Sequence, residues 1–395
     1  MRIAFYAPMK APNHPAPSGD RRIAQLLWQA LEAAGHDVFL ASDFRAYEGN
    51  GDSAKQQALA LQGGEIAAGL IEQWQAPDNK RGNAAGSPAP PDLWFSYHLY
   101  HKAPDWIGPA VSAALDIPYV AAEASYARKQ TGGPHAAGLE ASLRAIARAH
   151  AVLSFTPEDE EALLPIARHP TCLHRIAPFL DATPYRMAQA KRDGERAALA
   201  RQYGLDPGRP WLLAVAMMRP GDKLASYRLL SRALDLIADP PWQLLVVGDG
   251  IARQSVEDAL LPIGEEYVFF IGQQTPEKLP AFYAAADLLV WPAVNEAYGM
   301  LFLEAAAAGL PVVAGNWRGV SEIVANGETG ILIDPWDDID FAEAVVKLTG
   351  DTERRHALGA AAQLRAEKKH SVQTAITALN GALEKAQKIH AGAPA

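Results

Sequence analysis

The most informative segment of this chain is Asn295-Glu-Ala-Tyr-Gly-Met-Leu-Phe-Leu-Glu304-Ala-Ala-Ala-Ala-Gly309-Leu-Pro-Val-Val313. Two carboxylates, Glu296 and Glu304, stand eight positions apart, and a Tyr-Gly turn between them opens an apolar helix. A Gly-Leu-Pro break then leads into a short Val-rich strand. Such a unit places backbone N–H groups at a helix N-terminus, where phosphate binds well. The segment therefore suits a sugar nucleotide, with amides for the diphosphate and carboxylates for hydroxyl groups at either end.

Length and charge bound the possibilities further. A chain of 395 residues predicts two domains. The formal net charge of −9, from 45 acidic and 36 basic side chains, argues against a nucleic-acid partner. The single cysteine, Cys172, cannot form an intramolecular disulfide, and no pattern of zinc ligands is present. A reducing compartment fits this composition.

Neither a signal peptide nor a membrane span is predicted. The apolar run near the N-terminus has about four residues, where a signal peptide needs ~7–15. No apolar stretch approaches the ~18 residues of a membrane span. We therefore expect a cytoplasmic protein, and any membrane contact would be peripheral, at the inner face of the membrane.

Short apolar runs alternate with helical patterns along the whole chain. In the first half, strands are expected at 3–6, 37–41, 93–96, 119–122 and 151–154. In the second half, strands are expected at 211–216, 243–247, 267–270, 288–291, 311–314 and 330–333. The principal helices are expected at 19–34, 224–237, 276–285, 299–308, 340–348 and 371–390. This alternation is typical of parallel sheets covered by helices on both faces, so two doubly wound α/β units are predicted.

The junction between these units is expected around 177–184, where two prolines disfavour continuous helix. A Pro- and Gly-rich segment, 76–92, reads as a surface loop. The helix at 371–390 carries an apolar stripe, and periodicity alone would pack it on the domain that precedes it.

Residues 295–313 resemble the E-x7-E motif of retaining GT-B glycosyltransferases of family 4, the glycosyl transferases group 1. The segments 315–323 and 326–332 are also similar to that family. The resemblance extends over nearly the whole chain, but its motifs are specific only in the second half. It implies two facing Rossmann-like domains, with the acceptor on 1–180, the nucleotide-sugar donor on 181–368, and a helical segment 369–395 that crosses back to the first domain.

The resemblance also implies roles for the residues of the motif. Glu296 would bind hydroxyl groups of the donor sugar, and Glu304 would accept hydrogen bonds from the ribose. The backbone N–H groups of Gly299, Met300 and Leu301 would receive the diphosphate. A glycosidase acid/base pair is a poorer interpretation: if both acids were helical they would stand ~12 Å apart, beyond the ~5–9.5 Å that such pairs use.

Two further loops in the second half follow predicted strands. Arg219 and Lys223 lie after the strand at 211–216, at a sheet edge where open α/β sheets bind ligands. The resemblance makes them a clamp for the leaving diphosphate, and the other interpretation is a solvated basic loop. Gly248 belongs to Val247-Gly-Asp-Gly250, which matches the family's loop near the nucleotide base. The other interpretation of this segment is a simple turn that opens a helix.

In the first half, Gly19 precedes the first long helix, where the resemblance predicts close approach of donor phosphates and a helix cap is the alternative. The family places a histidine after a strand of this domain. His98 is our choice for that role, with His101 as its rival. Glu123 fits an acceptor contact or a structural ion pair. Aromatic residues near these histidines could form a stacking platform or belong to the core, namely Trp94, Phe95, Tyr97, Tyr100 and Trp106.

The sequence thus favours a hexosyltransferase with a nucleotide-diphosphate sugar, most commonly UDP-linked in this family, as its co-substrate. We expect no cofactor and no metal, because Asp338-Ile-Asp340 opens a predicted helix and reads as N-capping. The acceptor stays open among glycan, lipid, protein and small molecule. Two alternatives remain, a sugar-nucleotide 2-epimerase of the same architecture and a non-catalytic subunit that binds nucleotide sugar.

Overall fold

A computed structural model describes residues 1–16, 18–76, 89–126, 130–296 and 299–392. The chain divides into two compact units. The first unit comprises Met1–Ala177 together with Gln373–Ala395, and the second comprises Pro178–Val372. Each unit contains one six-stranded sheet, and every strand pairing in both sheets is parallel.

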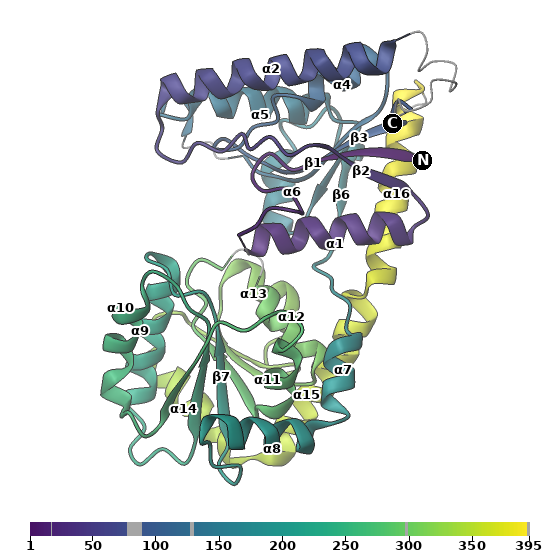
Figure 1. Ribbon diagram of the computed structural model, residues 1–395. Helices are drawn as coiled ribbons and strands as arrows, with labels where there is room; N and C mark the ends of the chain where they lie inside the picture. The colour runs from purple at the N-terminus through teal and green to yellow at the C-terminus, as the bar shows by residue number, and fades with distance from the viewer. Residues whose placement is uncertain (17, 77–88, 127–129, 297–298, 393–395) are drawn as a thin grey trace. The chain divides into compact units, whose positions relative to one another are not determined.

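The sheet of the first unit has the order β2-β1-β3-β4-β5-β6. Its strands are β1 (Arg2–Tyr6), β2 (Asp37–Ser42), β3 (Leu93–Leu99), β4 (Tyr119–Ala124), β5 (Ala151–Ser154) and β6 (Leu173–Arg175). Its helices are α1 (Gly19–Ala33), α2 (Ser53–Gln75), α4 (Gly108–Leu115), α5 (Ala136–Arg148), α6 (Pro157–Leu163) and α16 (Val372–His390), with a short 3-10 helix η2 (Pro170–Cys172). Helices α2, α4 and α5 lie on one side of the sheet and α1 on the other (Figure 1).

The sheet of the second unit has the order β12-β11-β10-β7-β8-β9. Its strands are β7 (Trp211–Val215), β8 (Gln243–Val247), β9 (Val268–Gly272), β10 (Leu288–Trp291), β11 (Val312–Gly315) and β12 (Ile331–Ile333). Its helices are α7 (Thr183–Gln189), α8 (Arg192–Tyr203), α9 (Asp222–Asp235), α10 (Arg253–Leu260), α11 (Leu279–Ala285), α12 (Met300–Ala307), α13 (Arg318–Ile323), α14 (Asp338–Gly350) and α15 (Thr352–Lys369), with η3 (Leu261–Ile263). The strand order reverses between β7 and β10, which are direct neighbours.

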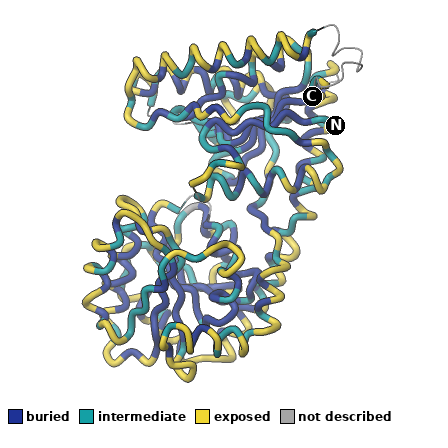
Figure 2. The backbone as a smooth tube through the Cα atoms, viewed as in Figure 1, coloured by how far each residue is buried: buried dark blue, intermediate teal, exposed yellow. Residues whose placement is uncertain are grey.

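The cores lie where the strands carry apolar side chains on both faces. In β7, β8 and β10 nearly every residue is fully buried, because helices cover the sheet on either side. Figure 2 shows the buried backbone following the strands, with exposed residues on the outer turns of the helices. The prediction of two doubly wound parallel units is confirmed. Among the described residues, no helix is long and apolar enough to cross a membrane.

The C-terminal helix α16 belongs to the first unit. Leu379 and Leu383 on its apolar stripe are fully buried. The Nε2 atom of His36 lies 3.0 Å from the Oδ1 atom of Asn380 on α16. The Nε2 atom of His390, at the end of α16, lies 3.0 Å from the backbone carbonyl oxygen of Asp116, which stands between β3 and β4. The return of this helix to the first domain, which the family resemblance implied, is confirmed. Packing on the preceding domain, which periodicity alone suggested, is wrong because the stripe finds its apolar partners on the first unit.

Two strands of the first unit are longer than their apolar runs predicted. β3 continues to Leu99 and β4 to Ala124, whereas the runs end at 96 and 122. His98 and Glu123 therefore lie within the last residues of these strands and not in loops after them. Both have left-handed backbones, with φ of 60° and 53°.

One carboxylate ties three elements of the second unit together. Asp287, just before β10, accepts hydrogen bonds from Arg192 at 2.6 Å and from Arg196 at 2.9 Å, both on α8. It also accepts a bond of 2.8 Å from the backbone N–H of Trp211, the first residue of β7. The Asp287 side chain is 14 % exposed, so these three donors replace most of its water.

We expect Asp287→Ala to lower the free energy of unfolding of the second unit by about 3 kcal/mol, because two guanidinium groups lose their anion. Urea unfolding followed by tryptophan fluorescence would measure this. Glu367→Ala is the matched control, since it breaks the exposed ion pair with Arg186 in the same unit and should cost less than about 1 kcal/mol. Equal losses in both variants would contradict the structural role given to Asp287.

Candidate functional site

Two loops of the second unit are fastened together at the carboxyl ends of β7 and β10. One loop, 216–221, leads from β7 into α9, and the other, with residues 292–296, follows β10. The buried hydroxyl of Ser226 accepts a hydrogen bond of 3.0 Å from the backbone N–H of Val294. The side-chain amide of Asn295 donates a bond of 3.0 Å to Asp222. Ligands of open α/β sheets bind at such a reversal of strand order.

An ion pair joins the same two loops. The ammonium group of Lys223, on the first turn of α9, donates a hydrogen bond to the carboxylate of Glu296. The two side chains are 18 % and 16 % exposed, and the ammonium lies 5.7 Å from the ring centroid of Trp291. The structure therefore brings together two residues that the sequence predicted separately. Arg219 lies in the loop before α9 and is exposed.

The N-terminus of α12 stands beside this pair. Gly299 is its N-cap with a left-handed φ of 60°, and a Cβ there would lie 2.6 Å from the ring of Phe302, so glycine is required. Within the described part of the chain, no side chain caps this helix. The backbone N–H groups of Met300 and Leu301 belong to its first turn, which has no intrahelical acceptors for them.

Glu304 lies one turn further along α12. Its Oε2 atom accepts a hydrogen bond of 2.7 Å from the hydroxyl of Tyr283, on α11. Burial, and then the charge of Glu304, raise the pKa of Tyr283 well above its ordinary value, so the phenol stays a donor. Sequence reasoning missed Tyr283. The signal was a tyrosine on the apolar face of a predicted helix, because a buried phenol needs an acceptor.

The Val247-Gly-Asp-Gly250 loop packs against the loop after β7. A Cβ on Gly248 would lie 1.9 Å from the carbonyl oxygen of Ala216, and one on Gly250 would lie 2.1 Å from that of Met218. The backbone N–H of Met218 also donates a hydrogen bond of 2.9 Å to the backbone carbonyl of Asp249. These glycines therefore serve close packing between backbones, which is more than the simple turn considered from the sequence.

The first unit gathers three ionisable residues at the carboxyl edge of its sheet. His98 at the end of β3 lies beside Asp20, in the first turn of α1, with Nδ1 and Oδ1 3.3 Å apart. Glu123 occupies the matching place at the end of β4. Ser18 caps α1 by accepting a bond of 3.2 Å from the backbone N–H of Arg21. The cap interpretation of this helix start is thus confirmed, and a role of Gly19 in binding phosphate stays a prediction.

His101 lies on the turn after β3. Its ring stands 5.2 Å from that of Tyr100 and 5.4 Å from that of His135, edge to face in both cases. Three of the aromatic residues considered for a stacking platform, Trp94, Phe95 and Tyr97, are fully buried and belong to the core. Tyr100 and Trp106 are half-buried.

A few predictions concern other places in the chain. Tyr298, in the Tyr-Gly turn of the motif, lies outside the described residues. The residue that caps α14 is Asp337, which accepts a bond of 2.9 Å from the backbone N–H of Asp340. The helix start predicted from Asp338-Ile-Asp340 is confirmed, and the capping acid is one residue earlier than the pattern suggested.

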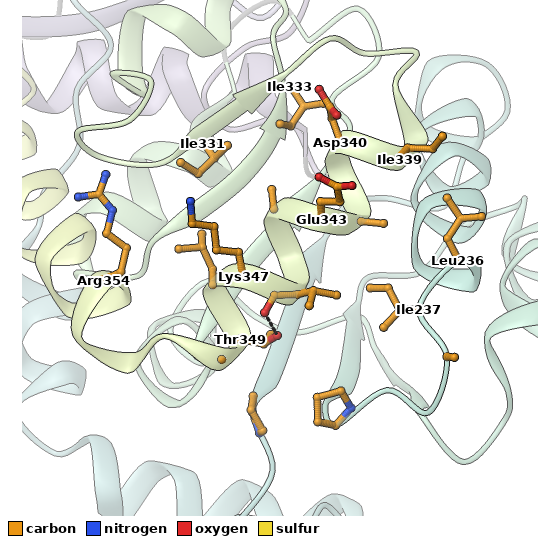
Figure 3. Close-up of a pocket in the computed structure, with 18 residues that line it drawn as sticks. Leu236, Ile237, Ile331, Ile333, Ile339, Asp340, Glu343, Lys347, Thr349 and Arg354 are labelled. Carbon is orange, nitrogen blue, oxygen red and sulfur yellow. Dashed lines mark hydrogen bonds between the residues drawn. The ribbon is translucent and has the colours of Figure 1, made fainter.

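A large cavity of the second unit lies away from the two fastened loops. It has a volume of about 1190 Å³ and is lined by residues of α14 and β12 and by residues 236–238, which follow α9, with Pro210 and Pro241 just before β7 and β8. Figure 3 shows apolar side chains such as Leu236 and Ile339 around it, with Glu343 and Lys347 on α14. Because it adjoins the amino ends of β7 and β8, it is separate from the carboxyl-edge site.

Two doubly wound parallel α/β units in one chain are the architecture of the GT-B class of fold. Residues 209–351 match the family model described as "Glycosyl transferases group 1". This match lies within the second unit, and the resemblance read from residues 295–313 to that family is confirmed.

Curated relatives and solved structures are also similar to this chain. The D-inositol 3-phosphate glycosyltransferase of Rhodococcus jostii (strain RHA1) is 34 % identical over 228 residues, 55 % of this chain and 48 % of that protein. The alpha-D-kanosaminyltransferase of Streptomyces kanamyceticus is 29 % identical over 243 residues, 61 % of this chain and 62 % of that protein. This chain spans about half the length of the inositol-phosphate relative.

The crystal structure of Anabaena Alr3699/HepE in complex with UDP and glucose superposes with a TM-score of 0.70, at 17 % identity, over 97 % of this chain and 99 % of that chain. This likeness shows the fold.

We expect Gly248→Ala to destabilise the second unit, because its Cβ would collide with the carbonyl of Ala216 at a φ of 144°. A fall in melting temperature of several degrees, about 2–8 °C, should accompany displacement of the loop after β7. Gly194→Ala is the matched control, since its Cβ on α8 meets open space. The control should be neutral or slightly stabilising, and a similar loss in both variants would contradict the packing argument.

Proposed function

We propose that this chain is a retaining hexosyltransferase that moves a sugar from a UDP-linked donor to an acceptor hydroxyl group. The observation that carries the proposal is the meeting of Lys223 and Glu296 with a helix N-terminus that no described side chain caps, at the switch point of the second sheet. Cation, carboxylate and amides are the three groups that a sugar diphosphate requires. The match of residues 209–351 to the glycosyl transferases group 1 supports the same reading.

The donor binds mainly to the second unit. Arg219 and Lys223 neutralise the leaving diphosphate, which also accepts hydrogen bonds from the amides of Gly299, Met300 and Leu301. Lys223 exchanges its partner in this step, because its ammonium is paired with Glu296 in the free chain. The carboxylate of Glu296 is thereby released to bind hydroxyl groups of the sugar.

The nucleoside and the acceptor occupy the remaining positions. Glu304, held by Tyr283, accepts hydrogen bonds from the ribose, and the backbone around Gly248 borders the base. The first domain, 1–180 in this proposal, binds the acceptor, with His98 at the edge of its sheet and Gly19 at the start of α1. The donor domain spans 181–368, and 369–395 completes the first domain.

A two-stage experiment tests this function. Thermal-shift measurements with UDP, GDP, ADP and their sugars would first establish donor binding, which stabilises the protein by mass action. UDP release would then be followed with and without candidate acceptors, including inositol 3-phosphate and simple sugars. Acceptor-dependent release is expected. Conversion of the donor into its C2 epimer would favour the epimerase, and binding without any turnover over the panel would favour a non-catalytic subunit.

We expect Glu296→Ala to reduce kcat by a factor of at least about 100, while the affinity for UDP stays within about threefold of the wild type. The reason is that Glu296 faces the sugar, not the nucleotide. Coupled assays of UDP release and calorimetric titration with UDP would measure the two quantities. Glu328→Ala, at an exposed turn of the same unit, is the control. Undiminished turnover in the Glu296 variant would refute the role.

We expect Arg219→Ala and Lys223→Ala each to weaken UDP binding by about tenfold or more, because each loses a charge-assisted hydrogen bond to the diphosphate. Uridine, which has no diphosphate, should bind all three proteins equally. Calorimetry with both ligands separates the two effects. An unchanged affinity for UDP in both variants would rule out the clamp.

A further inference from the structure

The ends of β3 and β4 are distorted at the same level. Tyr97 pairs with Ala122 and Leu99 pairs with Ala124, so His98 and Glu123 stand side by side between these two pairings. Both have left-handed φ values, 60° and 53°. Residues other than glycine hold this conformation at a cost of about 1–3 kcal/mol each, and they persist where the surrounding structure enforces them. The matched distortion therefore places an imidazole and a carboxylate together at the carboxyl edge of the sheet.

The carboxylate of Glu123 loses more hydration on burial than its hydrogen bonds replace. Its Oε2 atom is inaccessible to water and has no hydrogen-bond partner among the described residues. A buried carboxylate without its full set of donors is costly unless a nearby cation balances it. Among the described residues that act on Glu123, His98 is the one that can carry a positive charge. Its side chain is only 17 % exposed. Asp20 approaches the same ring from α1, 3.3 Å from Nδ1.

We propose that Asp20 and Glu123 are positioning residues that keep His98 as an imidazolium beside their carboxylates. His98 then serves the transferase proposed above as a fixed hydrogen-bond donor and positive charge at the edge of the first sheet. It does not serve as a general base, because both of its nitrogens carry protons. The role of this charge in turnover rests on the proposed function. The protonation of His98 itself does not.

The charges around the ring favour the imidazolium on balance. Burial alone lowers the pKa of His98, but the charge of Glu123 and the contact with Asp20 raise it above its ordinary value. The pKa of Asp20 is lowered despite its burial, because His98 and Lys10 lie nearby. Burial raises the pKa of Glu123, and the charge of His98 opposes that rise. Tyr97 and Asp159 also act on Glu123. Asp20 and Glu123 in turn act on Tyr100, which is also influenced by Tyr47 and Arg45.

The sign of the pH dependence follows from this arrangement. A raised pKa keeps His98 charged to a higher pH than an ordinary histidine, and the charge is lost as the pH rises through that pKa. Removing the negative charge of Glu123 lowers the pKa of His98, so the loss of charge moves to lower pH. The alkaline limb of the pH–rate profile should move in the same direction, because turnover requires the imidazolium.

NMR titration of the full-length chain tests the proposal without any substrate. The imidazole Cε1–Hε1 signal of His98 is assigned by its absence in His98→Gln. In the wild type it should titrate above the ordinary value of ~6.5. In Glu123→Gln and in Asp20→Asn the midpoint should fall by about one pH unit. Glu140→Gln, which removes an exposed carboxylate on α5, should leave the midpoint unchanged.

Several outcomes would overturn the proposal. A wild-type midpoint at or below the ordinary histidine value would do so, even if neither variant folds. Midpoints of both variants equal to that of the wild type would do so as well. With a transferable donor and acceptor in hand, the alkaline limb of kcat should follow the NMR midpoints in each variant. A shifted midpoint without any transferase turnover would leave the imidazolium established and refute the proposed function instead.

Discussion

The site of the second unit depends on the hydrogen bonds that hold the loop after β10 against the first turns of α9. β7 and β10 are far apart in sequence but adjacent in the sheet, and the sheet edge brings their loops together. The bond from Val294 to Ser226 is buried, so it is stronger than the same bond in water and costly to break. With the backbone held there, the ion pair between Lys223 and Glu296 forms with little loss of conformational freedom. Rigid backbone contacts thus position flexible charged side chains.

Glycine makes the approach of these loops possible. The carbonyl oxygens of Ala216 and Met218 occupy the space that side chains at positions 248 and 250 would need. Gly315, at the end of β11, meets the carbonyl oxygen of Pro292 at a distance where a Cβ would stand 2.0 Å away. The loops after β7, β8, β10 and β11 therefore pack through their backbones. This dense edge leaves polar backbone groups near any ligand that binds above it.

Sequence reasoning recovered the second unit more completely than the first. All six of its strands were predicted within two residues, because each is a short apolar run bounded by turn residues. In the first unit β6 was missed, since its three residues include His174 and Arg175 and form no apolar run. Helix α2 was also missed, because Gly63, Gly64 and Gly69 interrupt its pattern. Both elements form through tertiary packing that overrides local preference.

The site shows the same division between local pattern and packing. The motif supplied Glu296 and Glu304 directly, since both lie in one segment with a recognisable turn. Their partners, Lys223 and Tyr283, come from other elements, and strand order alone brings them near. Nothing in the residues around Asp20 indicates His98, 78 positions away, or Glu123 beyond it. Parallel sheets conceal such neighbours because strands adjacent in space are separated by whole helices in sequence.

Backbone strain points to the same two edges. Six described residues other than glycine have left-handed φ values, and four of them, His98, Glu123, Ala293 and Asn295, follow or end strands β3, β4 and β10. Strain of this kind is not needed to build a doubly wound sheet, whose strands and helices are otherwise regular. In a regular strand successive side chains point to opposite faces of the sheet, and a left-handed residue turns its side chain away from this pattern. In each unit the strained residues adjoin charged side chains that are largely withdrawn from water, so packing energy from the core is used to hold these groups in place. Packing in the interior of each sheet stabilises the fold, and it offsets the strain of the left-handed residues at the carboxyl edge.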